Sequence, residues 1–358
     1  MQATKKKIVL DCERMKYPHT GLYHFCFELG KEIISQSSAV GMDISIYTAK
    51  SCQEKFIGHS KFIDQSPLHK FILPSLHGFQ LWHATHQSTE YYPNHENIKI
   101  LLTIHDINFI HEKAKSTLKQ QREIEKLQKK IDRSDQVVAI SNFVKDDLLQ
   151  HFKIAEDKIK VIYNGCNIQG SRPVQVPLIP LKQAFIFTIG TIVAKKNFHV
   201  LPALLVGNDF QLVIAGITQK NGYQQQIIAE AEKLGVVDRL VFTGAISEAE
   251  KFWYYQQCRA FVFPSLMEGF GLPVVEAMAF GKPIFLSRKT SLPEIGGDVV
   301  QYFNSFDAAH MQETLMNGLK IYDEDANLKV RIIERSKLFS WQTSAKEYVE
   351  IYRQVLAQ

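Results

Sequence analysis

The chain has 358 residues, more than one compact core usually holds, and this length predicts two domains of ordinary size. Hydrophobic residues make up 45% and charged residues 22% of the chain, a balance that is typical of globular proteins and excludes the disordered and membrane-spanning classes. The net charge of +5 is too small to indicate a nucleic-acid partner. Binding of an anionic small molecule or of a membrane surface would be enough to explain this small positive charge.

Targeting and redox features predict a protein of the reducing cytoplasm. The apolar run Ile8–Leu10 after the first lysines is too short for a secretory signal, and no apolar stretch approaches the roughly 20 residues that span a bilayer. The cysteines are odd in number, widely spaced and without a CxxC pair, so they predict neither a disulfide framework nor a zinc site. They are Cys12, Cys26, Cys52, Cys166 and Cys258.

Short runs rich in β-branched residues alternate along the whole chain with longer amphipathic stretches. This alternation predicts repeated βαβ units around parallel sheets, and therefore an α/β fold. Ligands of such sheets bind beyond the carboxyl ends of the strands, so functional motifs should follow strands. The expected strands of the first half are residues 6–12, 42–49, 80–85, 99–107, 136–143 and 158–165, and those of the second half are 184–190, 210–216, 239–245, 260–265 and 283–288.

The segment between the two sets of strands contains Pro173, Pro177 and Pro180, which forbid both a helix and a central strand. We interpret it as a linker between two parallel-sheet domains that share a cleft. The last stretch, from Trp341, repeats apolar residues at the helical period and is expected to pack back towards the N-terminal domain. The predicted boundaries are 1–168 for the N-terminal domain, 169–182 for the linker, 183–340 for the C-terminal domain and 341–358 for the last helix.

The most specific segment is Pro264–Pro283, which reads PSLMEGFGLPVVEAMAFGKP. Pro273 suits a first helical turn and Gly281 followed by Pro283 is a helix stop, so a helix of about eight residues is predicted between them. Backbone N–H groups at its start, together with the helix dipole, would form a phosphate site, and the glycines keep side chains away from it. The residues expected there are Gly269, Phe270, Gly271 and Leu272.

Two glutamates flank this phosphate site: Glu268 in the loop, and Glu276, which we place in the first turn of the helix. A carboxylate beside a phosphate is unfavourable unless it faces neutral hydroxyls, so the pair indicates sugar hydroxyls on either side of a diphosphate. A nucleotide sugar has this layout. For either glutamate alone a simpler interpretation stays open, in which Glu276 complements the helix dipole and the glycines form a turn.

EGFGLPVVE, from Glu268 to Glu276, resembles the hallmark of glycosyltransferase family 4, a glutamate followed by seven residues and a second glutamate. The resemblance implies a retaining enzyme of the GT-B fold, with an N-terminal Rossmann-like acceptor domain and a C-terminal Rossmann-like nucleotide-sugar domain facing a central cleft. In the family the second glutamate, here Glu276, binds the ribose, and the first, here Glu268, binds hydroxyls of the transferred sugar. The loop between them contacts phosphates and sugar through its backbone.

The segment GTIVAKKN, from Gly190 to Asn197, is similar to a donor-binding segment of the family. The resemblance places Gly190, Thr191, Lys195 and Lys196 at the donor, with Lys196 neutralising the diphosphate. An arginine is more frequent in the family where this chain has Lys195, and the difference keeps a charge but removes a bidentate fork. The alternative is that both lysines belong to a solvated helix start.

In the first half, TIHDI resembles the family's HD loop and places His105 near the transferred sugar. Asp106 is the weaker member, because an aspartate after a strand is often a turn residue. The family also has a glycine-rich loop after the first strand that closes over the phosphates. Here HTGLYHF keeps Gly21 but has Tyr23 and His24 where glycine and arginine are common, so an ordinary helix start is the alternative role of Gly21.

The resemblance implies His105, Glu268 and Lys196 as the catalytic residues, with no cofactor and no metal. Fixed cations and helix-end amides would stabilise the charge that develops on the leaving diphosphate. The string Asp323–Asp325 matches the metal-binding Asp-x-Asp motif of other transferases, but it lies between two expected helices, far along the chain from the sugar-binding loops. Two carboxylates also fit a glycosidase, but the resemblance makes Glu268 a positioning residue and not a nucleophile.

Two other classes of protein compete with this interpretation. A non-catalytic nucleotide-sugar-binding subunit would have the same fold, but the presence of both glutamates, Lys196 and His105 disfavours it. A nicotinamide-dependent dehydrogenase is disfavoured because no GxGxxG follows the first strand and no acidic residue lies at the expected distance after one.

The Gly190–Asn197 segment and the SLPE loop, Ser291–Asp298, resemble the mannosyltransferase-rich part of the family. GDP-mannose is therefore the first choice of donor and a UDP-hexose the second, while Glu294 is left outside the core site. The expected acceptor is a glycan or a lipid-linked glycan in surface polysaccharide assembly, without nucleic acid. The basic stretch Lys113–Arg133 is interpreted as a solvated helix face, with peripheral contact to an anionic membrane as the alternative.

Overall fold

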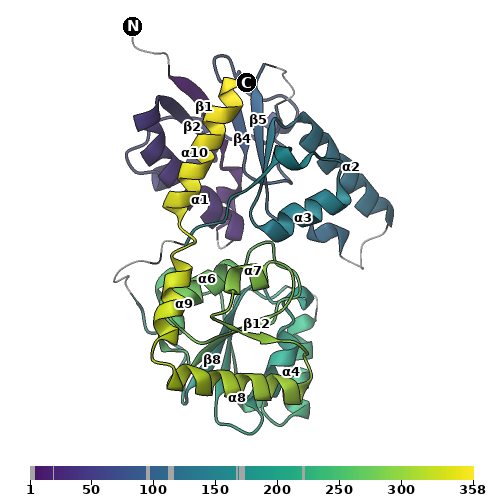
Figure 1. Cartoon of the computed structure of the whole chain (residues 1–358), viewed down its shortest axis with the longest axis vertical. Helices are drawn as coiled ribbons and strands as arrows, with labels where there is room; N and C mark the ends of the chain where they lie inside the picture. Colours follow the sequence, from purple (N-terminus) through teal and green to yellow (C-terminus); the bar gives the residue numbers. More distant parts are fainter. Residues whose placement is uncertain are drawn as a thin grey trace. The chain divides into compact units, whose positions relative to one another are not determined.

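A computed structural model of the chain describes residues 5–18, 20–93, 97–111, 117–166, 168, 174–219 and 222–358 (Figure 1). The chain forms two compact units. The first joins Met1–Gly165 to the C-terminal stretch Phe339–Gln358, and the second is Cys166–Leu338. The expected linker, 169–182, falls within the range of the second unit, and its residues 169–173 lie outside the described part of the chain.

The first unit is built on a parallel sheet with the order β3-β2-β1-β4-β5-β6-β7. Side chains on both faces of its central strands are buried, which explains their continuous apolar runs. The chain order reverses between β1 and β4, the position where ligands bind to such sheets. The strands are β1 (Lys6–Asp11), β2 (Met42–Thr48), β3 (Phe62–Asp64), β4 (Leu81–Ala84), β5 (Lys99–Ile104), β6 (Gln136–Ala139) and β7 (Ile159–Val161), and the α-helices are α1 (Gly21–Ser37), α2 (Thr117–Arg133), α3 (Asn142–His151) and α10 (Trp341–Ala357).

The C-terminal helix α10 belongs to the first unit, where it lies beside α1 (Figure 1). Its apolar face joins the core beneath β1 and β2. Two buried polar contacts fix its position: His83 Nδ1 in β4 lies 2.7 Å from the Tyr352 hydroxyl, and Thr103 Oγ1 in β5 lies 3.0 Å from the Tyr348 hydroxyl. Because buried polar groups need partners, these bonds hold the helix in one register on the sheet.

In the first unit, the segment through which the chain leaves and the segment through which it returns lie side by side. A Cβ atom at Gly165 would lie 2.0 Å from the backbone nitrogen of Trp341, so only glycine fits there. Gly165 is the last residue before the chain passes into the second unit, and Trp341 comes shortly after it returns. The end of the chain is therefore built into the unit that its beginning forms.

The second unit has a parallel sheet with the order β10-β9-β8-β11-β12-β13. Its central strands are also buried on both faces. The strands are β8 (Phe185–Ile189), β9 (Gln211–Ala215), β10 (Leu240–Gly244), β11 (Ala260–Phe263), β12 (Ile284–Ser287) and β13 (Gln301–Phe303), and the α-helices are α4 (Tyr223–Lys233), α5 (Glu248–Gln257), α6 (Leu272–Ala279), α7 (Leu292–Gly296), α8 (Ala308–Glu324) and α9 (Leu328–Ser336).

The α/β class predicted from the sequence is confirmed, and each expected strand is present. Two further strands, β3 and β13, were not predicted. Each has three residues and lies at one edge of its sheet. No residue of β3 is fully buried and in β13 only Phe303 is, so neither has the apolar run that marks the predicted strands.

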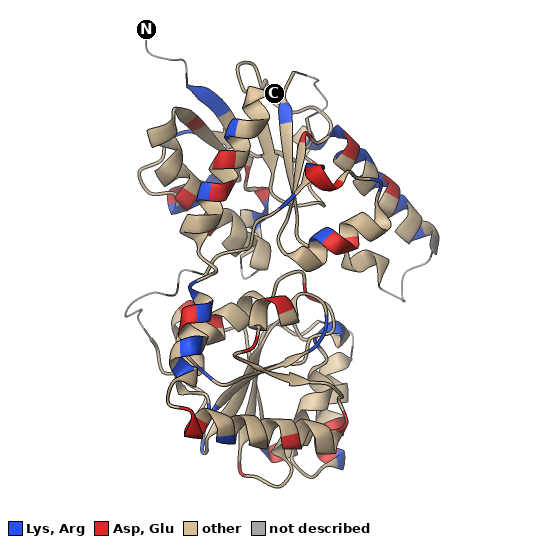
Figure 2. Ribbon diagram, in the orientation of Figure 1, with Lys and Arg blue, Asp and Glu red and all other residues tan. Residues whose placement is uncertain are grey.

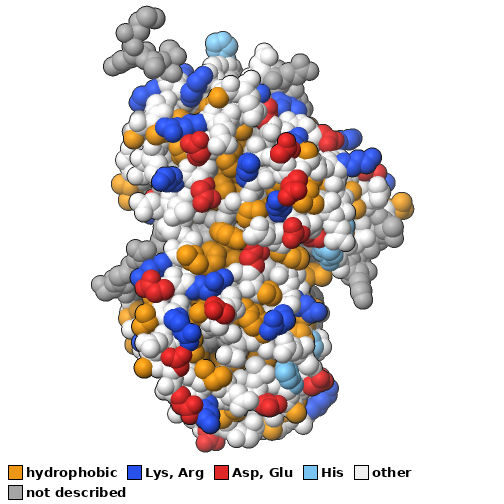
Figure 3. All heavy atoms as spheres, in the orientation of Figure 1, with side chains coloured by type: hydrophobic (Ala, Val, Ile, Leu, Met, Phe, Trp, Pro, Cys, Tyr) orange, Lys and Arg blue, Asp and Glu red, His pale blue; other side chains and the backbone are white. Residues whose placement is uncertain are grey.

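None of the described helices combines the length and the apolar character needed to cross a bilayer. Helix α2 turns Leu127 and Ile131 into its unit, while basic and acidic residues alternate along its outer side (Figure 2). This is the arrangement of a solvated helix; residues 113–116 of the basic stretch lie outside the described part. On the face drawn in Figure 3, the Lys and Arg side chains are interspersed with Asp and Glu. A mixed face of this kind differs from the basic patches of nucleic-acid-binding proteins.

Candidate active site

Helix α6 has the length that the sequence predicts. It spans Leu272–Ala279 with Gly271 as its N-cap, and Gly281, with a φ of +64°, follows its end. Gly271 has a φ of +99°, and a Cβ atom there would lie 2.8 Å from Cδ2 of Leu292, so both backbone and packing require glycine. Pro273 has no N–H and the Val274 N–H donates to the Gly271 carbonyl oxygen at 2.9 Å, so among the first helical residues the Leu272 N–H is the donor without an intrahelical acceptor. The start of α6 is therefore suited to bind an anion.

Lys196 and Glu268 form an ion pair between two loops of the second unit, Nζ to Oε1. Their side chains are only 15% and 14% exposed, and the ammonium lies 4.9 Å from the ring centre of Phe263. Charges at this depth interact more strongly than charges on the surface, so each partner fixes the position of the other. The pair places a cation for phosphate oxygens next to a carboxylate for hydroxyls, a combination that suits a nucleotide sugar.

Backbone bonds hold the loop of Lys196 against the loop of Glu268. The carbonyl oxygen of Lys195 accepts a hydrogen bond from the Leu266 N–H at 2.8 Å and one from Ser265 Oγ at 3.3 Å. The side chain of Lys195 is exposed. In this structure Lys195 therefore joins the two loops through its backbone, while the buried charge belongs to Lys196.

Gly190 and Thr191 directly follow β8, at the carboxyl edge of the second sheet. Gly190 has a φ of +153°, which favours glycine, and a Cβ atom on Gly216 in the next loop would lie 2.0 Å from its carbonyl oxygen. Thr191 is exposed beside it. The loops after the neighbouring strands β8 and β9 thus meet through backbone atoms alone. Without side chains at this point, a ligand can approach the backbone closely.

Glu276 does not lie in the first turn of α6, and that prediction was wrong. The helix begins at Leu272, after the Gly271 N-cap, so Glu276 is one turn deeper and nearly buried. Its carboxylate accepts hydrogen bonds from Lys251 Nζ at 2.7 Å and from the Tyr255 hydroxyl at 2.9 Å. A carboxylate has about four acceptor positions, so two partners leave room for hydroxyl groups.

Both partners of Glu276 come from α5, and the sequence analysis missed them. Burial alone would lower the pKa of Lys251, but Glu276 and Glu248 outweigh it and raise the pKa above its ordinary value. Burial and the charge of Glu276 likewise raise the pKa of Tyr255. Glu276 is therefore held between a full positive charge and a protonated phenol. No local pattern in the sequence links α5 to α6.

Thr290 and Ser291 were not predicted as site residues, but both contact the loop of Glu268. The Glu268 N–H donates to Thr290 Oγ1 at 3.1 Å. The Ser291 hydroxyl lies 3.0 Å from the carbonyl oxygens of Glu268 and Phe270. These contacts place the start of the SLPE loop directly behind the loop of Glu268, where it holds the backbone on both sides of Gly269. The signal in the sequence that could have indicated this role is the Ser-x-Pro pattern at the start of α7, in which Ser291 is the N-cap.

His105 lies in the first unit, at the carboxyl end of β5. Its Nε2 donates to the Thr85 carbonyl oxygen at 2.8 Å, and its ring meets Phe25 of α1 edge-on with 4.5 Å between centroids. Since a carbonyl only accepts, Nδ1 is the acceptor of the neutral ring. Burial lowers the pKa of His105 to about 4. The neutral imidazole is suited to accept a hydrogen bond from a sugar hydroxyl, and it carries no charge for a diphosphate.

Gly21 is the first residue of α1, and a Cβ atom there would meet nothing within 4 Å. Packing within the unit therefore does not require glycine at this position, and its donor-binding role stays a prediction. His19, in the same predicted loop, lies outside the described residues. The predicted site residues gathered in the second unit are Gly190, Thr191, Lys195, Lys196, Glu268, Gly269, Phe270, Gly271, Leu272 and Glu276, whereas Gly21 and His105 belong to the first.

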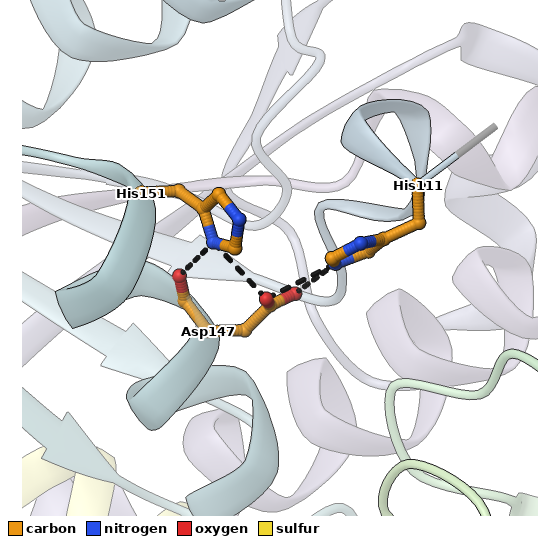
Figure 4. Close-up of side chains that lie close together, drawn as sticks. All are labelled: His111, Asp147 and His151. Atoms are coloured by element: carbon orange, nitrogen blue, oxygen red, sulfur yellow. Dashed lines mark hydrogen bonds and ion pairs between the residues drawn. The ribbon is translucent and has the colours of Figure 1, made fainter. Parts of the chain in front are cut away.

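One grouping among the described residues has the spacing of metal ligands: His111, Asp147 and His151 in the first unit (Figure 4). Their candidate ligand atoms lie within 4.8 Å of one another. His111 Nε2 is 3.0 Å from Asp147 Oδ2, and His151 Nδ1 is 2.9 Å from the Asp147 carbonyl oxygen. Hydrogen bonds alone account for this arrangement, which ties the loop after β5 to α3.

The acidic string Asp323–Asp325 at the end of α8 faces cations of the protein. Asp323 pairs with Arg259 at 2.5 Å, and Asp325 pairs with Arg331 at 2.6 Å. These carboxylates already have partners of opposite charge.

Two family models match the chain. The model described as "Glycosyl transferases group 1" matches residues 173–338, which include every predicted site residue of the second unit. The model described as "Glycosyltransferase Family 4" matches residues 67–169, which include His105.

Relatives of known activity include several mannosyltransferases. O-antigen chain mannosyltransferase B of Escherichia coli is 25% identical, over 97% of this chain and 99% of its own length. MMP alpha-(1->4)-mannosyltransferase of Mycolicibacterium hassiacum is 26% identical, over 65% of this chain and 57% of its own length. Serotype-specific mannosyltransferase WbdA of Escherichia coli is 29% identical over 63% of this chain, and that match covers 29% of its length.

Solved structures share the whole architecture. Sucrose-phosphate synthase from Thermosynechococcus elongatus has a TM-score of 0.77 at 19% identity, over 99% of this chain and 100% of its own. HepE of Anabaena, in complex with UDP and glucose, has a TM-score of 0.73 at 14% identity, over 98% of this chain and 100% of its own. At these identities the likeness establishes the fold alone, which confirms the predicted GT-B architecture.

Proposed function

This chain belongs to the GT-B glycosyltransferases described by the group 1 and family 4 models, and we propose that it transfers mannose from GDP-mannose to a glycan or lipid-linked glycan. The observation that carries the proposal is the Lys196–Glu268 pair in front of the start of α6. The reaction would serve surface polysaccharide assembly and retain the configuration of the sugar.

The chemistry follows from what each group offers. Departure of the nucleoside diphosphate builds negative charge, which Lys196 and the first N–H of α6 would stabilise in the transition state. Glu268 would accept hydrogen bonds from hydroxyls of the transferred sugar and orient it. Glu276, fixed by Lys251 and Tyr255, would accept from the ribose hydroxyls. His105 would accept from a sugar hydroxyl through Nδ1.

We propose that no metal takes part in this step. Lys196 and the helix start supply the positive potential that a divalent cation supplies in other transferases. In the second unit, the carboxylates of Asp323 and Asp325 are paired with arginines.

The choice of mannose is supported by the names of the relatives, among them O-antigen chain mannosyltransferase B, which matches over nearly the full length of both chains. Their identities of 25 to 29% are low, and HepE binds UDP on the same fold. The fold is therefore compatible with either nucleotide, and the donor has to be measured.

The decisive experiment is donor hydrolysis by the purified chain across a panel of GDP- and UDP-sugars in the presence of EDTA, scored by release of GDP or UDP. We expect release from GDP-mannose that survives EDTA and is lost in Glu268→Gln. The matched control is Glu294→Gln, which changes a glutamate of the neighbouring SLPE loop and should keep the activity. Release from a UDP-sugar alone would overturn the donor, and loss of activity with EDTA would overturn the metal-free mechanism.

A further inference from the structure

A cluster of charged residues lies in the first unit at the point where the order of its sheet reverses. Asp11 ends β1, the loop after β1 contributes Glu13, Arg14 and Lys16, and the loop after β4 contributes His86. In open α/β sheets this position, beyond the carboxyl ends of the strands on either side of the reversal, is where ligands bind. None of the roles proposed above uses these residues.

Glu13 is the centre of the cluster. Its Oε1 lies 2.8 Å from Arg14 Nε and 3.2 Å from His86 Nε2, and its Oε2 lies 2.8 Å from Lys16 Nζ. His86 Nε2 also lies 2.8 Å from Arg14 Nε, which donates to it, and His86 Nδ1 lies 3.1 Å from the Ser88 backbone nitrogen. Burial alone would raise the pKa of Glu13, but His86, Lys16 and Arg14 lower it to about 2.

The cluster has more positive than negative charge. Arg14 and Lys16 share the single negative charge of Glu13, and Lys130, whose Nζ donates to two backbone carbonyls of the loop after β4, adds a third cation. Burial lowers the pKa of Lys130 only to about 8, so it is mostly charged at neutral pH. Burial and the charge of Glu13 raise the pKa of Asp11 to about 7, so it is only partly ionised. A surplus of positive charge remains at neutral pH.

The cations lie at the surface of the cluster and the carboxylate at its base. Glu13 and His86 are 3% and 1% exposed, whereas Arg14 and Lys16 are 27% and 28% exposed. Arg14 Nε donates to His86 Nε2 and forms an ion pair with Glu13, and in the part of the chain that the structure describes its two terminal nitrogens make no hydrogen bond. Glu13 thus holds Arg14 and Lys16 in place while their outer N–H groups face solvent, a geometry that suits the oxygens of a phosphate group.

The cluster is continuous with the HD loop. Gln87, the neighbour of His86, accepts from the His105 N–H at 3.1 Å and donates to the Asp106 carbonyl oxygen at 2.7 Å. One short loop therefore joins the cations to the histidine that we expect at the transferred sugar. An acceptor held by a phosphate group at the cations would be held next to the reacting centre.

We propose that Arg14 and Lys16, braced by Glu13 and His86, bind a phosphate or diphosphate group of the acceptor. The inference rests on the proposed glycosyl transfer to a lipid-linked glycan, and it assigns the anionic part of that acceptor to the switch point of the first sheet. The cations select for the phosphate group, so the site does not depend on which sugar follows it.

The test measures binding directly and does not need turnover. Calorimetry with inorganic pyrophosphate and with farnesyl diphosphate is carried out on the full chain carrying Lys196→Gln, which weakens the competing diphosphate site of the second unit. We expect Arg14→Gln and Lys16→Gln each to reduce both affinities by at least about tenfold, since hydrogen bonds to charged groups are lost. Lys31→Gln, an exposed lysine on α1 in the same unit, is the matched control and should change neither affinity.

Affinity for GDP, measured without the Lys196 change, separates the two sources of a diphosphate. If Arg14→Gln and Lys16→Gln reduce GDP binding by the same factor as farnesyl diphosphate binding, the cations serve the donor and the proposal is wrong. Equal pyrophosphate affinity in the variants and the control would also overturn it. Since either change leaves Glu13 with one cation fewer, the melting temperatures of both variants are measured, and a loss of affinity counts only where the variant stays folded. The absence of GDP or UDP release from every donor in the hydrolysis experiment would instead contradict the proposed function.

Discussion

The two units hold their functional residues in place by different means. In the second unit both glutamates of the EGFGLPVVE segment face lysines, Glu268 with Lys196 and Glu276 with Lys251. The first unit has the ion pairs of Glu13 but adds histidines that stay neutral: burial lowers the pKa of His105 and of His86 to about 4 and that of His83 to about 3. A site built from fixed ion pairs suits a charged donor, whereas neutral imidazoles suit hydroxyl groups.

The largest effect is expected at the nearly buried Lys251–Glu276 pair of the second unit. Lys251→Met leaves the Glu276 carboxylate nearly buried without its cation, and we expect the free energy of unfolding to fall by about 3–5 kcal/mol. Denaturant unfolding measures it. Lys233→Met, which breaks an exposed pair with Glu230, is the control and should cost no more than about 1 kcal/mol. Similar losses in the two variants would show that burial of the pair is unimportant.

The next effect is on turnover. Lys196→Gln removes the buried cation of the donor site, and we expect kcat for donor hydrolysis to fall by about 100- to 1000-fold, as when one transition-state donor is lost. Lys195→Gln is the matched control, because its side chain is exposed and its carbonyl holds the loops. It should lose much less. Equal losses would mean that net charge in this loop matters and the buried pair does not.

Acid should weaken the first unit through its histidines. The pKa values of His83, His86 and His105 are below the ordinary 6.5, so the unfolded chain binds more protons between about pH 6.5 and pH 4. Stability is therefore present above this window and is lost as the pH falls through it. Asp11 opposes the trend, since its pKa is raised to about 7 and its proton is bound in the folded state.

The net loss for the first unit should be on the order of 2 to 3 kcal/mol between pH 7 and pH 5. Hydrogen exchange of amides in β4 and β5 reports it separately from the second unit. His83→Gln removes one of the three titrating rings and should make the dependence on pH shallower. An unchanged free energy over this range would show that the imidazoles are not held neutral.

The smallest effect concerns the His111–Asp147–His151 grouping. Because hydrogen bonds already account for its geometry, we expect His151→Gln and exhaustive chelation to leave donor hydrolysis unchanged. Turnover with and without added zinc measures this. If the rate depended on zinc in the unmodified chain but not in His151→Gln, the first unit would bind a functional metal ion. Neutral imidazoles would then not be its only functional use of histidine.

Those parts of the fold and the site that depend on neighbours in sequence could be predicted. The strands with full apolar runs and the eight-residue helix α6 are local patterns, and Glu268, Glu276 and Lys196 belong to short motifs. The partners of these residues could not be predicted, because Lys251 and Tyr255 reach Glu276 only through the packing of α5 on α6.

The sequence also did not reveal which charged side chains are buried. The predicted start of α6 differs from the observed one by a single residue, but Glu276 is its fifth residue and therefore lies in the second turn, where packing buries it. Glu13 and Arg14 look like surface residues of a loop, and only the order of the strands brings His86 beside them. The roles of Gly21 and His105 at the donor stay predictions.

The close contact of Gly165 with Trp341 has a consequence for synthesis on the ribosome. The core of the first unit includes buried side chains of α10, which is translated after the second unit. At about 5–20 residues per second, the emerging N-terminal sheet waits on the order of ten seconds or more for this helix while the whole second unit is made. The nascent chain therefore carries an incomplete core in the first unit until α10 has been made.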